Sequence, residues 1–550
     1  MESQFGITEF LLGHQLAPIR NQYLSKSTDL YIQEVNENGE EVIPARNAVI
    51  RAPPEIGGIN QNIQKLNFMS DINLLELDRH FTNGGKRVVM KVNPNDWKKR
   101  RELKGFLEQR YNGSMVSKQQ GRSIVVSHIS MLKERPTWDE GTPVFCHFTL
   151  AKENMDMQEA LATIAKALGY IEVTDFTFNE DKGHRAVSSQ RVCVRHVLER
   201  TLLQINNGMS KIKVFNVEYK NEAIQPFSNK GNQFTVILRN IAEESINELA
   251  ERFKGLESTG FINYIGTHAI GMKCHIASEA GLAILKKNFE RAVKLILLFC
   301  QKDVWSPALQ LFFTTGDARQ AAAALTAVDT LNAGRFLTTL KDGGTFQACI
   351  DKLPRAEAEK FVHAYQFHLW NKLATERMRE GGYRVLGYDL GADGQPLELC
   401  APVFDIHLPM PGCQTEQSED TYSGRHILRL LAADGITLSD FQSLERLKYS
   451  TRPRPLFMRM FNFSSCVIEY SENDILQAGV RTGRNNYSGS LRALKMSFFL
   501  PPDAYVSAAL REATSTDMSQ RAHVDASKPQ TADDFMHSEH KRHELEILCR

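Results

Sequence analysis

The sequence FTFNEDKGHRAVSSQ, residues 176–190, contains a charged segment between two less polar stretches. An apolar alternation, Phe176 and Phe178, comes before the segment, and the run Arg185-Ala186-Val187 comes after it. Charged residues and a glycine between two such stretches indicate a loop. The question is whether this loop is an ordinary connection or an active-site loop that has lost its reactive group.

The sequence on both sides of this loop predicts a mixture of helices and strands. Residues 155–169 have apolar positions at helical spacing and end at Gly169, a typical helix C-cap. Residues 234–239 indicate a buried strand, and residues 29–39 alternate up to an Asn-Gly turn, as a hairpin strand does. We expect short strands and turns through the rest of residues 1–80, and helices at 282–299, 318–328 and 356–379. This pattern over 550 residues predicts an α/β or α+β body of two or more packed units.

The charge balance excludes a global field that would attract nucleic acid. The formal net charge is +1, with 42% hydrophobic and 24% charged residues, as in an ordinary globular protein. Any RNA-binding surface must therefore be a local patch. Residues 91–104, KVNPNDWKKRRELK, form the most basic cluster. They are either the solvated face of a helix that starts near Asp96 or a patch that contacts phosphates.

The cysteines and the apolar runs suggest a reducing compartment. The nine cysteines are scattered singly without a CxxC pair, so we expect neither a metal site nor a disulfide framework. Cytoplasm, nucleus and mitochondrial matrix all fit. The longest apolar run, 295–300, is far shorter than the roughly 20 residues that span a bilayer, and residues 1–20 lack a secretory or transit pattern. We therefore expect no membrane association. The polar composition of residues 513–550 separately indicates a flexible tail.

Seven blocks follow one another along nearly the whole chain: CHFTLAKENMDMQEAL (146–161), the loop at 176–190, KGNQFTVILRN (230–240), GFINYIGTHAIG (260–271), HAYQFHLWN (363–371), LPMPG (408–412) and LRALKMSFFLPPDAYVSAALRE (491–512). Together these blocks resemble the TruD family of pseudouridine synthases, especially its eukaryotic members. Any one of these blocks could be chance, but seven in the same order are specific. GITEF (6–10) and the strand after Asp29 are similar to the beginning of the family sequence.

The resemblance implies an α+β pseudouridine synthase fold, with a mixed, mainly antiparallel sheet and flanking helices, interrupted by a TruD-type α/β insertion domain. On this pattern the parts are a catalytic-type domain (1–290, with an accessory insertion at 84–142), the inserted domain (291–485), a return to the catalytic-type domain (486–512) and the tail (513–550). The implied activity is a cofactor-free, metal-free isomerisation of uridines in RNA. The target uridine would be extruded into the pocket, because its glycosidic bond is otherwise buried in the stack.

The family chemistry depends on the aspartate of the pattern G-T-K-D-K-R-A. Matching Arg185-Ala186-Val187 to the end of this pattern places Lys182 on the family lysine, His184 on the next basic position and Gly183 on the aspartate. Matching from Phe176 forward gives the same register without a gap. Glycine has no side chain that can attack or act as a base. Asp181 is a possible substitute, but only if the loop slips by two residues.

The second family motif differs as well. In GFINYIGTHAIG, Asn263 and Tyr264 match the family, whereas Ile265 takes the place of an aromatic and His268-Ala269 that of a Gln-Arg pair. An isoleucine cannot stack on a base as an aromatic does, and alanine cannot pair with a carboxylate or phosphate. The residues for which the resemblance implies a place at the RNA cleft are Lys152, Asn154, Lys182, His184, Arg185, Asn263, Tyr264, Ile265, His268, Arg492 and Lys495.

Each of these residues also has a structural interpretation. Tyr264 could belong to the core, His268 to the core or the surface, and Arg492 and Lys495 to salt bridges. Residues 230–232 could be a tight turn before a strand rather than a backbone site for phosphate.

Three functions follow as hypotheses. The first is an RNA-binding homologue without catalysis, acting in ribosome assembly or tRNA maturation, with rRNA or tRNA and with ribosomal or assembly-factor proteins as partners. The second is an active uridine isomerase that uses Asp181. The third is a protein scaffold with no role in RNA, consistent with the net charge of +1.

Overall fold

The computed structural model describes residues 2–11, 16–44, 59–60, 62–83, 88–90, 96–111, 115–120, 123–128, 138, 143–183, 185–207, 211–271, 273–300, 306–326, 329–412, 421–442, 452–479 and 487–518. The chain divides into two compact units. Unit 1 consists of residues 1–30 and the chain from Phe234 onward, and unit 2 consists of Tyr31–Gln233.

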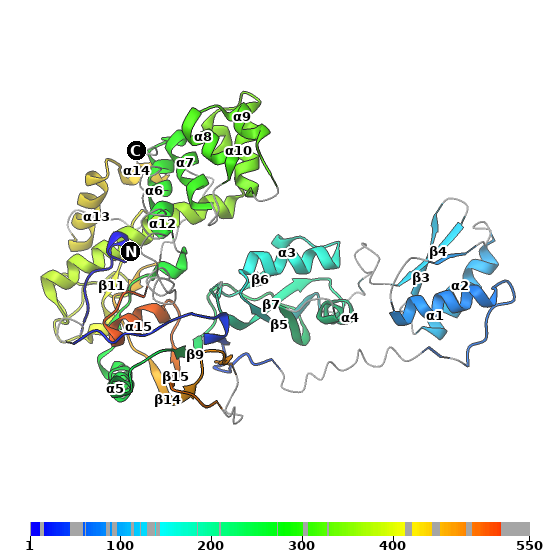
Figure 1. Ribbon diagram of the computed structural model, residues 1–550, viewed down its shortest axis with the longest axis horizontal. Helices are drawn as coiled ribbons and strands as arrows, with labels where there is room; N and C mark the ends of the chain where they lie inside the picture. The colour runs from blue at the N-terminus through cyan, green and yellow to red at the C-terminus, as the bar shows by residue number, and fades with distance from the viewer. Residues whose placement is uncertain are drawn as a thin grey trace. The chain divides into compact units, whose positions relative to one another are not determined.

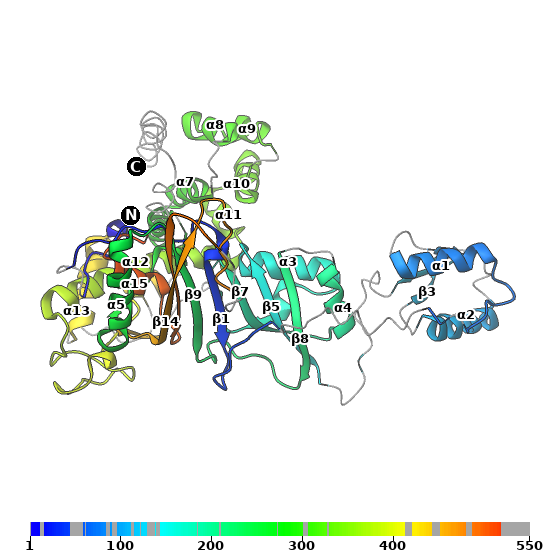
Figure 2. The same cartoon turned by 60° about the horizontal axis from the view of Figure 1, so that its bottom comes forward.

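Unit 2 is built on a mixed sheet in which β1 (Leu30–Val35), β7 (Val187–Arg195), β5 (Phe145–Glu153) and β8 (Ile212–Lys220) are neighbours in that order. β1 runs parallel to β7, and the other pairs are antiparallel. The short β6 (Phe176–Phe178) pairs with β7. The apolar face of α3 (Met157–Leu168) covers the sheet, and its leucine, isoleucine and alanine side chains form one core with those of β5 and β7 (Figures 1 and 2).

The accessory part of unit 2 has a core of its own. It contains α1 (Asp71–Asn83), β2 (Val88–Met90), α2 (Trp97–Arg110), β3 (Met115–Gln120) and β4 (Ser123–His128), with strand order β2-β4-β3. Leu77 of α1 and Leu103, Phe106 and Leu107 of α2 are buried in this core, together with Val126 of β4. We call residues 59–128 the accessory module.

Unit 1 combines strands with many helices. β14 (Phe461–Tyr470) pairs antiparallel with β15 (Leu491–Leu500), and β9 (Gly231–Leu238) follows β15 in the strand order. Two short pairs, β10 (Phe261–Ile262) with β13 (Phe457–Met458) and β11 (His407–Leu408) with β12 (Arg454–Pro455), are also antiparallel. The described α-helices of unit 1 are α5 (Glu243–Thr259), α6 (Cys274–Leu285), α7 (Phe289–Cys300), α8 (Pro307–Thr315), α9 (Ala318–Ala323), α10 (Leu331–Lys341), α11 (Phe346–Asp351), α12 (Arg355–Gly381), α13 (Tyr422–Ala433), α14 (Leu438–Gln442) and α15 (Val506–Thr514). Unit 2 contains one further short helix, α4 (Glu199–Leu203).

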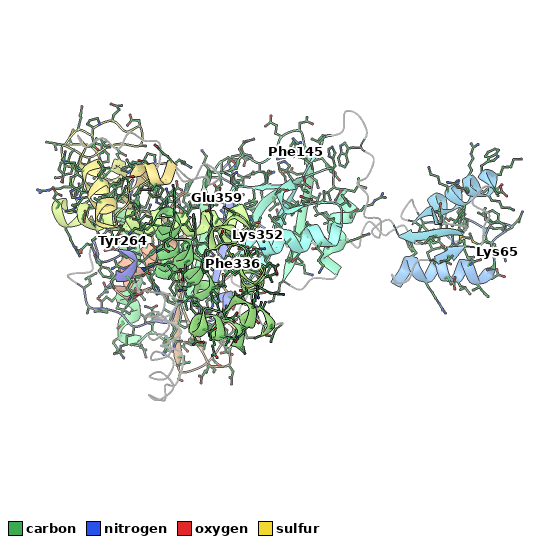
Figure 3. The ribbon with its side chains drawn as sticks, turned by 90° about the horizontal axis from the view of Figure 1, so that it is seen from above. Lys65, Phe145, Tyr264, Phe336, Lys352 and Glu359 are labelled. Atoms are coloured by element: carbon green, nitrogen blue, oxygen red, sulfur yellow. The ribbon has the colours of Figure 1, made fainter. Side chains whose placement is uncertain are left out.

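The long helix α12 organises the interior of unit 1. Its side chains Trp370, Leu369 and Leu373 are fully buried in a large apolar cluster. Helices α6 and α7 and the side chain of Phe5 also contribute to this cluster. Tyr264 and Phe336 lie inside this unit among the helices (Figure 3). No described helix is long and apolar enough to cross a membrane.

Most of the predicted elements are confirmed. The helix that ends at Gly169 is α3, and Gly169 has φ 79°, the left-handed conformation of a C-cap glycine. Asp96 caps α2, because its side chain accepts a hydrogen bond from the Lys99 amide. The mixed, mainly antiparallel sheet with flanking helices confirms the α+β prediction.

Two predictions were wrong. The expectation of only strands and turns within residues 1–80 missed α1. Among the side chains of α1 that the structure describes, Leu77 alone is fully buried, so the helical pattern is weak. The helix expected over 282–299 is two helices, α6 and α7, with Lys287 at φ 56° between them. This left-handed residue stops the first helix, and an apolar pattern that continues through the break conceals it. The residues of the predicted tail beyond 518 lie outside the described part of the chain.

Candidate functional site

The loop at residues 179–186 connects β6 to β7 in unit 2. β6 pairs antiparallel with β7, with Phe176 opposite Val194 and Phe178 opposite Val192, so the loop closes a hairpin at the beginning of β7. β5 lies on the other side of β7, with Lys152 opposite Ser188. β1 pairs in parallel with the same end of β7. The loop therefore lies next to side chains from two further strands.

Lys182 points into the protein and is 3% exposed. Its Nζ lies 2.6 Å from Oε1 of Glu180 and 3.7 Å from Oε2 of Glu34, which comes from β1. The Glu180 carboxylate also accepts hydrogen bonds from Nδ2 of Asn229 (3.2 Å) and of Asn232 (2.9 Å). The lysine that matches the family motif is thus held between the buried carboxylate of Glu34 and the half-buried carboxylate of Glu180.

Burial affects the two carboxyl groups differently. Burial raises the pKa of Glu34, and the charge of Lys182 and a hydrogen bond from Asn179 (3.1 Å) oppose the rise only in part. The Oε2 atom of Glu34 has no hydrogen-bond partner. For Glu180, burial also favours the neutral form, but Lys182 and the two asparagine donors outweigh it and hold the pKa below its usual range.

Lys152 is hydrogen-bonded to the main chain of the loop. It is 2% exposed, and its Nζ donates hydrogen bonds to the main-chain carbonyls of Lys182 (2.7 Å), Gly183 (3.2 Å) and Met155 (2.9 Å). Burial lowers the pKa of Lys152, and the nearby charges of Asp181 and Asp156 oppose this effect. The next family residue, Asn154, is exposed, and its amide donates to the Ala186 carbonyl (2.9 Å).

Gly183 lies exposed in the middle of this anchored loop. A Cβ atom placed on it would have no other atom within 4 Å, so a side chain here would enter open space. Asp181 is also exposed, and the buried Lys182 lies between the two. Arg185 is half-buried, and His184 lies outside the described residues.

The loop is fixed at its other positions too. Asn179 accepts hydrogen bonds on Oδ1 from the amide (3.0 Å) and the hydroxyl (2.9 Å) of Ser228. The side chain of Gln190 donates to the Glu180 carbonyl (3.0 Å). Polar contacts within unit 2 therefore hold Asn179, Glu180, Lys182 and the carbonyl of Gly183 in place.

The second family motif lies in unit 1, where its side chains are buried. Asn263 is fully buried, and its Nδ2 donates to the carbonyls of Pro455 (3.1 Å) and Asp503 (3.2 Å), leaving Oδ1 without a partner. The Tyr264 hydroxyl is 2.7 Å from Oγ1 of Thr375 and accepts from the Glu9 amide, and burial raises its pKa. These contacts agree with the interpretation of Tyr264 as a core residue.

Ile265 belongs to the core of unit 1. Its side chain is fully buried, and the amide of Asn371 binds both its N–H (2.9 Å) and its carbonyl (3.0 Å). The following Gly266 packs so closely on α15 that an added Cβ would lie 2.0 Å from Oγ of Ser507. His268 is half-buried, with Nε2 2.8 Å from the Met518 carbonyl and its ring edge-on to Tyr23.

The remaining predicted contacts lie on β15 and at the beginning of β9. Arg492 forms ion pairs with Glu469 (3.0 Å) and Glu243 (3.7 Å), and Lys495 donates to the Gln477 carbonyl (3.3 Å). Burial lowers the pKa of Lys495. Lys230 comes directly before β9, which includes Gly231 and Asn232, and its main-chain N–H donates to the Val35 carbonyl (3.0 Å).

The sequence analysis missed the partners of Lys182. Glu34 was not singled out, although it follows the buried Leu30 and Ile32 at alternate positions of β1, where a carboxylate must find a buried partner. Asn229 carried no signal of its own, because asparagines near turns are common, and Asn232 was considered only for its main chain, within residues 230–232. Among the described residues, no group of three or more His, Cys, Asp and Glu side chains is placed to hold a metal ion.

Comparison with known proteins identifies relatives along almost the whole chain. The family model described as tRNA pseudouridine synthase D (TruD) matches residues 115–387. A Caenorhabditis elegans protein named as a candidate pseudouridine synthase is 34% identical over 97% of this chain and 96% of its own length. The human pseudouridylate synthase 7 homolog is 24% identical over 94% of this chain and 81% of its own. The crystal structure of a candidate tRNA pseudouridine synthase D from Methanosarcina mazei covers 94% of this chain and 98% of its own, with 15% identity and a TM-score of 0.52, and has a similar fold.

Proposed function

Because the chain belongs to the TruD family of pseudouridine synthases, we propose that it binds structured RNA, a tRNA or an rRNA, without isomerising uridine. In this role it acts as an RNA-maturation or ribosome-assembly factor, with RNA and the proteins of such an assembly as partners. The proposal rests on Gly183, which corresponds to the family aspartate when the residues on both sides of the loop are matched to the family pattern. The chain keeps the supporting structure of the loop but lacks the carboxylate that the family chemistry requires.

The contacts around Gly183 argue against a rescue by a slip of the loop. To bring Asp181 to the place of residue 183, Glu180 would have to move to the place of Lys182. Glu180 would then face the buried Glu34 with no cation between the two carboxylates. Two like charges in a buried site disfavour each other strongly, and the ammonium of Lys182 would lose both of its acidic partners.

One observation favours the alternative, an active isomerase that uses Asp181. Asp181 and Gly183 are both exposed, on either side of the buried Lys182, so they share one side of the loop. In extended chain, residues two apart are roughly 6–7 Å from each other. Catalytic groups must be placed to within about 0.5 Å, and this displacement is what makes Asp181 the second choice.

The test uses the chemistry of the isomerisation. The glycosidic bond moves from N1 to C5 of the uracil, and the hydrogen on C5 leaves to solvent. We expect no release of tritium from tRNA and rRNA transcripts labelled at C5 of uridine when the purified chain is added. Activity that disappears in Asp181→Asn would overturn the proposal in favour of the alternative.

A gain-of-function pair sharpens the test. Gly183→Asp places a carboxylate in open space on a loop that keeps its anchors, so we expect tritium release at least about 100-fold above background. The matched variant Gly183→Asn has the same size without the charge and should stay inactive. If Gly183→Asp binds RNA but remains inactive, the loss extends to the second motif, at Ile265 and Ala269.

A further inference from the structure

Positive charge is concentrated in the accessory module. Residues 59–128 contain 13 Lys and Arg and 6 Asp and Glu, a net charge of +7. The other residues contain 53 Lys and Arg and 59 Asp and Glu, a net charge of −6. The formal charge of +1 for the whole chain therefore hides a basic segment in an acidic protein, and only a local field of this kind attracts a polyanion.

The positive charge is most dense on α2, and one face of this helix packs against the core of the module. Leu103, Phe106 and Leu107 are buried in the module core. Arg110 is bound to Asp78 of α1 through two hydrogen bonds (3.1 and 2.8 Å). The fold of the module fixes the orientation of α2, so its opposite face is turned to solvent.

That outer face carries an exposed aromatic residue among cations. Trp97 is 64% exposed, and Nζ of Lys98 lies 6.0 Å from the centre of its ring. Arg101 and Lys104 are exposed and lie four and seven residues after Trp97, which places them on the same face of the helix. A large apolar ring in water with cations beside it combines the two elements that single-stranded nucleic acids bind, a surface for stacking and charges for phosphates.

We propose that this face of α2 binds a single-stranded segment of RNA, with a base stacked on Trp97 and with Lys98, Arg101 and Lys104 at the phosphates. The inference rests on the proposed function for the choice of RNA as the ligand. It adds a binding surface that is distinct in sequence from the loop at 179–186. A membrane surface fits less well, because an interfacial helix needs a broad apolar face, and the apolar face of α2 is buried in the module.

The first experiment measures stacking. The full chain is titrated into a fluorescein-labelled oligouridylate RNA and binding is followed by anisotropy. Trp97→Ala should weaken binding at least about fivefold, the lower end for the loss of one stacked base. Trp97→Phe keeps an aromatic ring and should retain most of the affinity. Equal affinity of the Ala variant and the wild type would overturn the assignment of Trp97.

The second experiment measures the phosphate contacts through the salt dependence. Loss of two phosphate contacts in Arg101→Ala/Lys104→Ala should make the slope of log affinity against log salt shallower by about 1.4, about 0.7 for each contact with a single strand. The control is Arg319→Ala/Lys341→Ala, which removes the same charges from exposed positions on α9 and α10 and should leave the slope unchanged. Unchanged thermal unfolding of both double variants excludes a folding defect.

The outcomes separate this inference from the proposed function. If the wild-type chain binds none of the oligouridylate, tRNA and rRNA probes, both fail. If it binds RNA and the α2 variants bind equally well, only the present inference fails. If the α2 variants lose binding to vesicles of phosphatidylcholine and phosphatidylserine and keep binding to RNA, the face recognises anionic lipid and the inference is overturned.

Discussion

Two segments that resemble family motifs differ in the space that they leave for a side chain. The loop at 179–183 in unit 2 is held by buried charges, with Lys182 between Glu34 and Glu180 and with Lys152 beneath the main chain. Its Gly183 faces open space. In the segment 263–266 of unit 1, by contrast, the side chains are packed into the core and Gly266 has no room for a Cβ.

This difference shows which change one substitution could reverse. At Gly183 the surroundings accommodate a side chain, so a carboxylate can be added there without disturbing the loop. At Ile265 an aromatic side chain would have to enter a filled core, where overpacking costs about 1–3 kcal/mol. The residues that hold the loop are therefore different from Gly183. In the segment 263–266, by contrast, the residues of the motif are themselves packed in the core.

The largest effect should come from removing the charge that the loop encloses. Lys182→Met leaves the buried Glu34 and the half-buried Glu180 without their cation, and we expect a loss of about 3–5 kcal/mol in the free energy of unfolding of unit 2. Urea unfolding followed by hydrogen exchange of β6 and β7 peptides measures it. Lys166→Met, at an exposed position of α3, is the control and should change stability by less than about 0.5 kcal/mol. A mild effect of Lys182→Met would mean that the loop does not depend on its buried charges.

The same substitution at two glycines compares the free space directly. Gly266→Ala should destabilise unit 1 by about 1–3 kcal/mol, because the new Cβ meets the Ser507 hydroxyl, and Gly266→Ala/Ser507→Ala should recover part of the loss. Gly183→Ala should change the stability of unit 2 by less than about 0.5 kcal/mol. Thermal unfolding of the variants measures both. Equal losses at the two positions would remove the contrast between the segments.

The smallest effect concerns pH and Glu34. Because burial raises the pKa of Glu34, the folded state takes up a proton before the unfolded state does as the pH falls. The ionised group is thus least favourable at neutral pH, and its contribution to stability improves as the pH falls through the raised pKa toward the usual glutamate range. Glu34→Gln removes this dependence. The stability of the variant relative to the wild type should be higher at neutral than at mildly acidic pH, by about 1 kcal/mol or less. The opposite sign in urea midpoints at the two pH values would contradict the assignment.

The sequence by itself determined those features that local rules control. Gly169 ends α3 in the left-handed conformation, Asp96 caps α2, and the alternation at 29–39 becomes β1. The proposal that Gly183 takes the place of the family aspartate also comes from the sequence, because the matches on both sides of the loop require no gap.

Only the tertiary structure decided what surrounds that glycine. Glu34, Lys152 and Lys182 are far apart in the chain and meet because β1 and β5 flank β7. No local pattern encodes this meeting, since it depends on the pairing and register of strands that are distant in sequence. The same holds for Ile265 and Gly266, whose environment is set by the packing of α12 and α15. Whether a position has space for a side chain is a property of its neighbours in space, and these are fixed only when the strands and helices have packed.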